Sequence, residues 1–224
     1  MESLRKMYYR VLRFSHFNDI FLNSFIRSKS VDKLHMGCGQ VLLSGWCNIM
    51  YERGKEYGNP KMHNGARFLN YDLLAPWLWM ENSIRNIAAA HFIEHLNLDQ
   101  CLEFCAKAYK ILSPGGVLRL SCPDLEIYAR NYCAGNATFF NDEKIKKFCF
   151  AGQARTQSQI FASKAYDNGV HKWFHDFSSI RDVMERCGFR LIRKLSRLEG
   201  QTPDLHLLEL PEREIETLYV EGEK

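Results

Sequence analysis

The apolar residues of this chain fall into short continuous runs separated by polar segments. Runs of this length, continuous rather than alternating, are typical of strands buried on both faces of a sheet. We predict seven strands, over residues 33–36, 46–51, 67–72, 84–91, 117–122, 189–195 and 218–222.

Helical spacing of apolar residues appears between several of these strands. Residues 98–112 place Cys101, Cys105 and Ala108 on one face, and residues 177–187 stop at a glycine suited to a helix C-terminus. Weaker patterns predict helices over residues 124–132 and 141–150, and residues 153–168 form a polar stretch. Alternation of strands with helices predicts an α/β fold, with a mostly parallel sheet covered on both faces.

The connection between the first two strands is unusually short. Only residues 40–45 lie there, whereas a parallel crossover usually needs about a dozen residues. We therefore expect a single helical turn at this point. Residues 3–28 carry apolar residues at helical spacing with basic residues between them, so residues 1–31 are expected to form a helical extension. It would dock on the body or contact an anionic membrane surface.

Composition favours one domain spanning residues 1–224, with an insertion over residues 134–170. The chain has 224 residues, of which 46% are hydrophobic, and contains no apolar run of the ~18 residues needed to span a bilayer. Its eight cysteines include no C-x-x-C pair, which indicates reduced thiols in a cytoplasm and no metal site.

The net charge of +4 lies entirely in the first 33 residues, which carry seven basic and three acidic side chains. The rest of the chain has 23 residues of each sign and therefore no general attraction for polyanions. We expect a small-molecule or glycoconjugate partner and no nucleic acid. The basic extension would allow a cytoplasmic protein to contact the inner membrane surface.

A Gly-Cys-Gly loop, residues 37–39, follows the first predicted strand, and its glycines permit close approach of a ligand to the backbone. Further motifs follow at matching distances: Asn48-Ile49-Met50-Tyr51-Glu52, Asn70-Tyr71-Asp72-Leu73, Ala88-Ala89-Ala90-His91 and Ser113-Pro114-Gly115-Gly116. Together these segments resemble the class I S-adenosylmethionine-dependent methyltransferases. Within that family the chain is most similar to small bacterial enzymes associated with cell-surface polysaccharide.

The resemblance implies a Rossmann-like sheet of seven strands, the last antiparallel, and S-adenosylmethionine as cofactor, with S-adenosylhomocysteine as product. The family usually has an acid where this chain has Met50. Glu52 lies two residues on, on the same side of the strand, and is the expected substitute for binding the ribose. The residues that the resemblance assigns to the cofactor are Gly37, Cys38, Gly39, Glu52, Asp72, Leu73 and His91.

The resemblance also implies methyl transfer to an oxygen of a sugar or glycoconjugate, with residues 134–170 as a lid. A hydroxyl acceptor needs a base, and we expect His91 or His171, with Asp124 orienting the base or the acceptor. An acceptor that is already ionised, such as a carboxylate or phosphoryl oxygen, needs none. Further residues expected to contact the acceptor are Glu94, His95, Tyr128, Trp173 and His175.

Three other functions remain open from the sequence. Residues 91–95 match H-x-x-E-H, a zinc-peptidase signature that requires one helix carrying both histidines. Nucleic-acid methyltransferases usually carry an Asn/Asp-Pro-Pro-aromatic turn where this chain has His91-Phe92-Ile93. The missing acid at Met50 is the reason to consider a non-catalytic binding protein.

Overall fold

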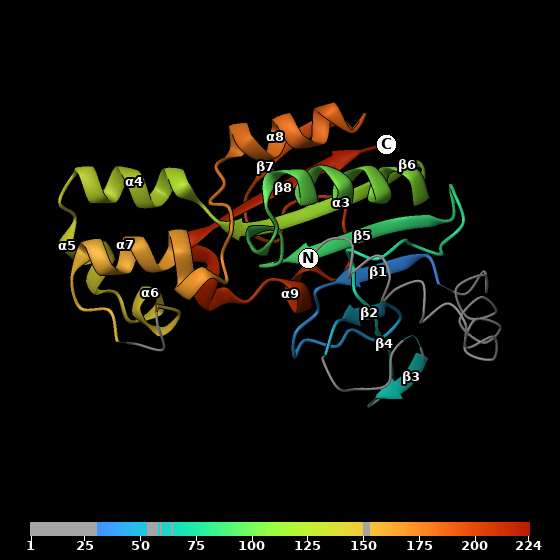
Figure 1. Cartoon of the computed structure of the whole chain (residues 1–224), viewed down its shortest axis with the longest axis horizontal. Helices are drawn as coiled ribbons and strands as arrows, with labels where there is room; N and C mark the ends of the chain where they lie inside the picture. The colour runs from blue at the N-terminus through green and yellow to red at the C-terminus, as the bar shows by residue number, and fades with distance from the viewer. Residues whose placement is uncertain (1–30, 53–57, 59, 64, 150–152) are drawn as a thin grey trace.

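The computed structural model describes residues 31–52, 58, 60–63, 65–149 and 153–224 (Figure 1). The amphipathic helix expected over residues 3–28 lies outside these ranges. The described residues form one eight-stranded sheet in the order β3-β4-β2-β1-β5-β6-β8-β7. Its strands are β1 (Lys33–Met36), β2 (Cys47–Met50), β3 (Pro60–His63), β4 (Ala66–Asn70), β5 (Ile84–Ala90), β6 (Leu112–Pro123), β7 (Arg190–Leu195) and β8 (Thr217–Glu223).

The pairing of the strands confirms the predicted α/β fold. β1 pairs in parallel with β2 and β5, β2 with β4, and β5 with β6, while β8 is antiparallel to β6 and to β7. The eighth strand, β3, is an edge strand antiparallel to β4 that the sequence pattern did not predict. The chain proceeds outward from β1 on both sides, so a topological switch point lies between β1 and β5. In open α/β sheets, ligands bind beyond the carboxyl ends of the strands at such a point.

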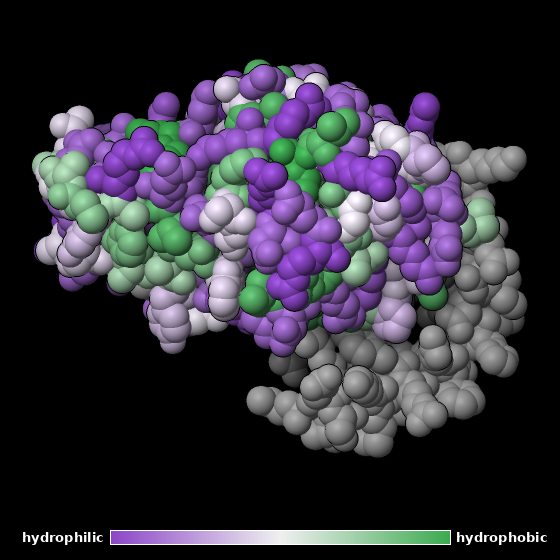
Figure 2. Space-filling view, turned by 90° about the horizontal axis from the view of Figure 1, so that it is seen from above, coloured by the Kyte–Doolittle hydropathy of each residue, from purple (hydrophilic) through white to green (hydrophobic). Residues whose placement is uncertain are grey.

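Two helices, α3 (Leu98–Ile111) and α8 (Phe177–Arg186), cover one face of the sheet (Figure 1). Asn97 begins α3 with a capping box that also involves Gln100, and Asp176 caps α8. Phe104 and Met184 are buried with the sheet residues in the main core. The outer side of this layer is mostly hydrophilic (Figure 2), as expected for amphipathic helices with one buried face.

The opposite face of the sheet is covered differently. The single helical turn expected over residues 40–45 is not formed, and this short connection contains no helix. Trp46 is fully buried there and packs in a small cluster with Leu43 and with the one-turn helix α9 (Leu205–Leu208). The indole Nε1 of Trp46 donates to Asp204 Oδ2 at 2.8 Å. The sequence pattern did not predict α9, whose Leu205 and Leu208 pack in the same cluster as Ala88 of β5.

Residues between β6 and α8 form a helical lobe beyond the carboxyl ends of the strands (Figure 1). It comprises α4 (Leu125–Cys133), α5 (Ala137–Asn141), α6 (Glu143–Lys147) and α7 (Gln157–Tyr166). Of the helix predicted over residues 141–150, residues 143–147 form α6; α5 was not predicted, and the polar stretch predicted over residues 153–168 contains α7. The lobe has its own hydrophobic core around Tyr128, which is separate from the main core.

The longest of the described helices, α3, has 14 residues. Within the ranges given above, no helix combines the length and apolar character needed to cross a membrane.

Candidate functional site

The carboxyl ends of the parallel strands bring the residues predicted to bind the cofactor to one edge of the sheet. Gly37 and Gly39 follow β1, Glu52 follows β2, Asp72 follows β4 and His91 follows β5. Parallel pairing of β4, β2, β1 and β5 makes the carboxyl ends of these four strands neighbours.

The two glycines of the loop after β1 serve different purposes. Gly37 has φ +67°, and a Cβ at this position would lie 2.5 Å from the ring of Phe92, so Gly37 permits close packing of two loops. Gly39 has φ +53°, and a Cβ there would meet no described atom within 4 Å. Gly39 therefore presents backbone to open space, as a loop that cradles a ligand requires.

Cys38 and Glu52 lie close to this loop. The backbone N–H of Cys38 donates to Ile49 at 3.0 Å, and burial raises the pKa of the Cys38 thiol to about 12, with the charge of Glu52 adding to the effect. Cys38 therefore contributes backbone, not a thiolate. Glu52 is held by Asn70, which accepts from the Glu52 N–H at 2.8 Å and donates to its carbonyl at 3.0 Å.

Asp72 and Leu73 occupy the turn after β4. Asp72 Oδ1 accepts from the backbone N–H of Leu74 at 2.9 Å, and its carbonyl accepts from Ala75 at 2.8 Å. Asp72 therefore stabilises the turn, and Leu73 is buried in the main core. These contacts fix the turn at the same edge as the glycine loop.

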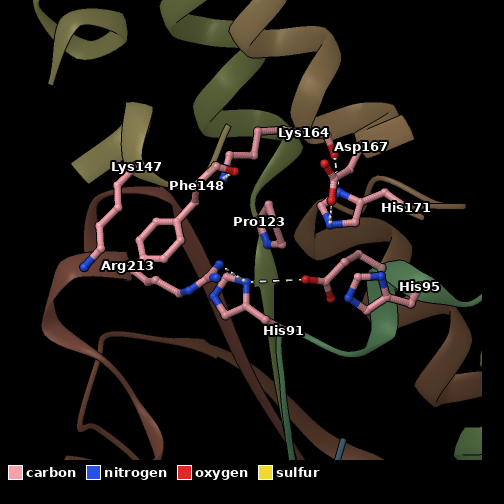
Figure 3. Close-up of a pocket in the computed structure, with 10 residues that line it drawn as sticks. His91, His95, Pro123, Lys147, Phe148, Lys164, Asp167, His171 and Arg213 are labelled. Atoms are coloured by element: carbon pink, nitrogen blue, oxygen red, sulfur yellow. Dashed lines mark hydrogen bonds and ion pairs between the residues drawn. The ribbon is translucent and has the colours of Figure 1, made fainter. Parts of the chain in front are cut away.

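A cavity of about 270 Å³ lies on the other side of His91, between the ends of β5 and β6 and the helical lobe (Figure 3). In Figure 3, His95, His171 and Asp167 lie on one side of it, and Arg213, Phe148 and Lys147 on the other. The residues that line it are His91, Glu94, His95, Pro123, Lys147, Phe148, Lys164, Asp167, His171 and Arg213. The cavity is thus rich in imidazole and charged groups.

His91 ends β5 with φ +49°, a conformation that is uncommon for a residue other than glycine. Its Nε2 lies 3.1 Å from Thr217 Oγ1, whose own hydroxyl donates to the carbonyl of Arg213 at 2.6 Å. Nε2 must therefore carry the hydrogen, which leaves a lone pair on Nδ1. Arg213 donates to this Nδ1 at 3.1 Å. Burial lowers the pKa of His91, although Glu94 opposes the shift, so the imidazole is neutral at neutral pH.

Glu94 lies beside His91 in the 3-10 turn η1 (Ile93–His95), and its Oε1 is 3.3 Å from His91 Nδ1. Burial disfavours ionisation of Glu94, but the neighbouring His91 and His95 outweigh it and hold the pKa of Glu94 below its usual range. The second oxygen, Oε2, is buried and has no hydrogen-bond partner among the described residues. The Glu94 carbonyl accepts from the N–H of Lys172 at 2.8 Å, which ties η1 to the segment after the lobe.

His95 and His171 are brought together from distant parts of the sequence, with their ring centroids 5.0 Å apart. His171 Nδ1 donates to the carbonyl of Lys164 at 2.7 Å, and His95 Nδ1 lies 3.3 Å from the carbonyl of Val170. His171 Nε2 lies 3.9 Å from Asp167 Oδ2. The sequence-predicted residues His91, Glu94, His95 and His171 therefore all line the cavity.

Three basic residues of the cavity, Lys147, Lys164 and Arg213, were not predicted from the sequence, and the last two pair with the buried Glu216. Lys164 Nζ lies 2.7 Å from Glu216 Oε2, and Arg213 lies 3.5 Å from Glu216 Oε1. The Arg213 guanidinium also stacks 3.8 Å from the ring centroid of Phe148. No local signal marks these residues, because Lys164 and Arg213 occur in polar segments that read as solvent-exposed.

Asp124 does not reach the cavity, contrary to its predicted role beside the base or the acceptor. It is fully buried at the N-terminus of α4, where Oδ1 accepts from the N–H of Glu126 at 2.9 Å. Oδ2 accepts from Lys194 at 3.0 Å. Asp124 therefore caps a helix and forms an ion pair.

The predicted acceptor contacts of Tyr128, Trp173 and His175 are also not supported by the geometry. Tyr128 is fully buried in the lobe core and donates to Glu216 Oε2 at 2.5 Å, so its ring cannot stack on an acceptor. His175 is fully buried between Ser179 and Cys101. Trp173 is exposed and is not among the residues that line the cavity.

The zinc-peptidase hypothesis is wrong for residues 91–95. His91 ends a strand, and only residues 93–95 form a single helical turn. His91 and His95 therefore do not share one helical face, which that signature requires.

No family model matches this sequence, and no curated protein matches it. Among solved structures, one similar to this chain is an S-adenosylmethionine-dependent methyltransferase from Thermotoga maritima, described as a possible histamine N-methyltransferase. The two share 16% sequence identity with a TM-score of 0.51, over 100% of this chain and 96% of the other. The fold is the class I methyltransferase fold.

Two further solved structures are similar to this chain. A possible exported protein from Bordetella parapertussis has a TM-score of 0.50 at 14% identity, over 95% of this chain and 67% of its own. An S-adenosylmethionine-dependent methyltransferase from Archaeoglobus fulgidus has a TM-score of 0.46 at 12% identity, over 93% of this chain and 98% of the other. At these identities the likeness concerns the fold and does not extend to an acceptor.

Proposed function

We propose that this protein transfers the methyl group of S-adenosylmethionine to an oxygen of a small, oxygen-rich acceptor such as a sugar or glycoconjugate unit. The observation that carries the proposal is the adjacency of two features at one sheet edge. Phe92 packs on Gly37 of the open loop, and the preceding residue, His91, lines the cavity. A donor held at the loop and an acceptor held in the cavity would meet at His91.

The residues at the loop fit this donor. Gly39 offers open backbone for close approach, and Glu52, fixed by Asn70, can accept hydrogen bonds from ribose hydroxyls. The turn at Asp72 and Leu73 would bound the adenine. S-adenosylmethionine, when bound, supplies a methyl group activated by its sulfonium.

His91 is the base that the geometry supports best. Its tautomer is fixed by Thr217, so Nδ1 bears the lone pair and faces the cavity side where Arg213 and Glu94 lie. With both ligands bound, the acceptor hydroxyl would take the place of Arg213 at Nδ1 and give its proton to this nitrogen. The methyl group that its oxygen receives would come from the sulfonium of S-adenosylmethionine. Glu94 Oε1 would then accept from the new N–H and stabilise the imidazolium.

The cavity supports an oxygen acceptor of limited size. Sites for drug-sized ligands usually measure about 300–1,000 Å³, and this one measures about 270 Å³. Its lining of imidazole, ammonium, guanidinium and carboxylate groups suits hydroxyl-rich ligands better than apolar ones. A single sugar unit, or the end of a longer glycoconjugate, is an acceptor of this kind.

A second candidate acceptor is an anion, a carboxylate or phosphoryl group. Lys147, Lys164 and Arg213 together place three cationic groups around the cavity. An anionic oxygen needs no base, so replacing His91 would then leave methyl transfer almost unchanged. The two candidates therefore make opposite predictions for His91→Ala.

The donor site is tested by replacing Gly39 with valine and measuring S-adenosylhomocysteine binding by calorimetry. The matched control is Gly115→Val, because Gly115 also has φ above zero and open space at its Cβ but lies at the opposite end of the sheet. We expect micromolar-range binding by the parent protein and by Gly115→Val, and at least a tenfold loss in Gly39→Val. Equal affinities in all three folded proteins would refute the assignment of the loop.

A further inference from the structure

We propose that Glu94, His95 and His171 bind a divalent transition-metal ion in the wall of the cavity. The role we give the ion, to hold the acceptor oxygen beside His91, rests on the proposed methyl transfer. The site itself rests on the arrangement of its three side chains.

One carboxylate oxygen and two imidazole nitrogens form a compact cluster. One ligand atom from each of Glu94, His95 and His171 lies within 4.8 Å of the others. His95 and His171 lie on the same side of the cavity (Figure 3). The hydrogen bond from the Lys172 N–H to the Glu94 carbonyl fixes η1 against the segment that carries His171. Only small side-chain movements would close the cluster around an ion.

Both imidazoles are already oriented as metal ligands usually are. A histidine that binds a metal through one nitrogen almost always donates the other N–H to a carbonyl or carboxylate. His171 Nδ1 donates to Lys164 at 2.7 Å, and His95 Nδ1 lies 3.3 Å from the carbonyl of Val170. These contacts leave Nε2 of each ring as the ligand atom.

The carboxylate of Glu94 provides an independent observation. Its side chain is 3% exposed, and Oε2 lacks a hydrogen-bond partner within the described part of the chain. A buried carboxylate oxygen without a hydrogen-bond partner is costly. Oε1 faces His91, so Oε2 can serve a cation without breaking that contact. A metal ion would satisfy this oxygen.

The ligand set selects the class of ion. Two imidazoles and one carboxylate suit Zn²⁺, Mn²⁺ or Fe²⁺, whereas Mg²⁺ prefers oxygen ligands alone. Three protein ligands leave coordination positions for an acceptor oxygen. The nearby cations Lys164 and Arg213 both pair with Glu216, which reduces their repulsion of the ion. Asp167, 3.9 Å from His171 Nε2, adds a second negative charge.

The test is calorimetric titration of the chelator-treated full chain with Zn²⁺ and, separately, Mn²⁺, with Mg²⁺ as a comparison. We expect one ion per chain for Zn²⁺ and at least a tenfold weaker response to Mg²⁺. His95→Ala and His171→Ala should each weaken Zn²⁺ binding at least 100-fold. The control is His206→Ala, because His206 is exposed on α9 and should leave binding unchanged.

Glu94→Gln removes the charge but keeps the shape, and should weaken Zn²⁺ binding as strongly. Glu94 is buried, so if this variant does not fold, the two half-buried histidines carry the test. Absence of stoichiometric binding, or binding that both histidine variants leave unchanged, would overturn the site.

Binding of S-adenosylhomocysteine to the same metal-free protein separates this inference from the proposed function. Nucleoside binding without metal binding would remove the metal site and leave methyl transfer standing. Metal binding without nucleoside binding would support the site and remove the role given to it.

Discussion

Gly37 offers a sharp test of how the loop after β1 is built. Gly37→Ala would place a Cβ 2.5 Å from the Phe92 ring, at a backbone with φ +67°. Left-handed backbone costs an L-residue about 1–2 kcal/mol, and overpacking adds typically 1–3 kcal/mol. We therefore expect Gly37→Ala to lower the free energy of unfolding by about 2–5 kcal/mol.

Gly39→Ala is the matched control, because Gly39 has φ +53° but no described atom within 4 Å of its Cβ position. It should lose only the backbone contribution, about 1–2 kcal/mol. Urea denaturation of both variants isolates the clash with Phe92 as the difference between them.

A double-mutant cycle with Phe92→Ala sharpens the same test. Removing the ring should lower the cost of Gly37→Ala, with an interaction free energy of about 1–3 kcal/mol. The Phe92 Cβ, which Phe92→Ala keeps, lies 2.9 Å from the added Cβ, so Gly37→Ala should stay more costly than Gly39→Ala in this background. Equal destabilisation by Gly37→Ala and Gly39→Ala, with no coupling to Phe92, would show that the two loops are not packed as described.

Three further predictions concern other parts of the molecule. Glu52→Ala should weaken binding of S-adenosylhomocysteine by about 1–3 kcal/mol in calorimetry, because charge-assisted hydrogen bonds are lost; unchanged affinity would mean that another group holds the ribose. Burial lowers the pKa of His35 from 6.5 to about 4, although Asn48 opposes this. Below pH about 6.5 the unfolded chain binds a proton that the folded chain excludes, so about 3 kcal/mol of stability is lost as the pH falls to about 4; unfolding titrations of a His35→Gln variant should lack this loss. Lys164→Ala leaves the buried Glu216 without its closest cation and should cost about 3–5 kcal/mol in urea denaturation; a cost under 1 kcal/mol would show that Arg213 alone compensates.

The main sheet could be predicted from the sequence because its central strands contain short buried apolar runs, such as residues 87–89 of β5. The same reasoning placed His91 at the carboxyl end of β5, the edge at which ligands bind in open α/β sheets. Apolar periodicity did not predict α7, because the residues of this helix lack a clear apolar face. The helix depends on a capping box between Thr156 and Gln159 and on burial of Ile160 in the core of the lobe.

Burial of individual side chains was the other limit of prediction. Tyr128 and His175 have the chemistry of binding residues, but each is fully buried and hydrogen-bonded inside the protein. Residue type does not reveal this. Arg213 was missed because its position depends on the tertiary fold. Arg213 lies in the turn before β8, and the return of the chain at this point brings its guanidinium to His91 at the end of β5.

The helical lobe is a single continuous stretch of chain that leaves the sheet after β6 and returns before α8. Its inner residues supply one wall of the cavity, whereas the glycine loop, Glu52 and Asp72 belong to the first half of the sheet. One contiguous exchange of sequence could therefore replace this wall of the cavity while leaving the glycine loop, Glu52 and Asp72 untouched. Under the proposed function, selectivity for the acceptor could be changed by exchanging this one segment, without altering the strands that carry it.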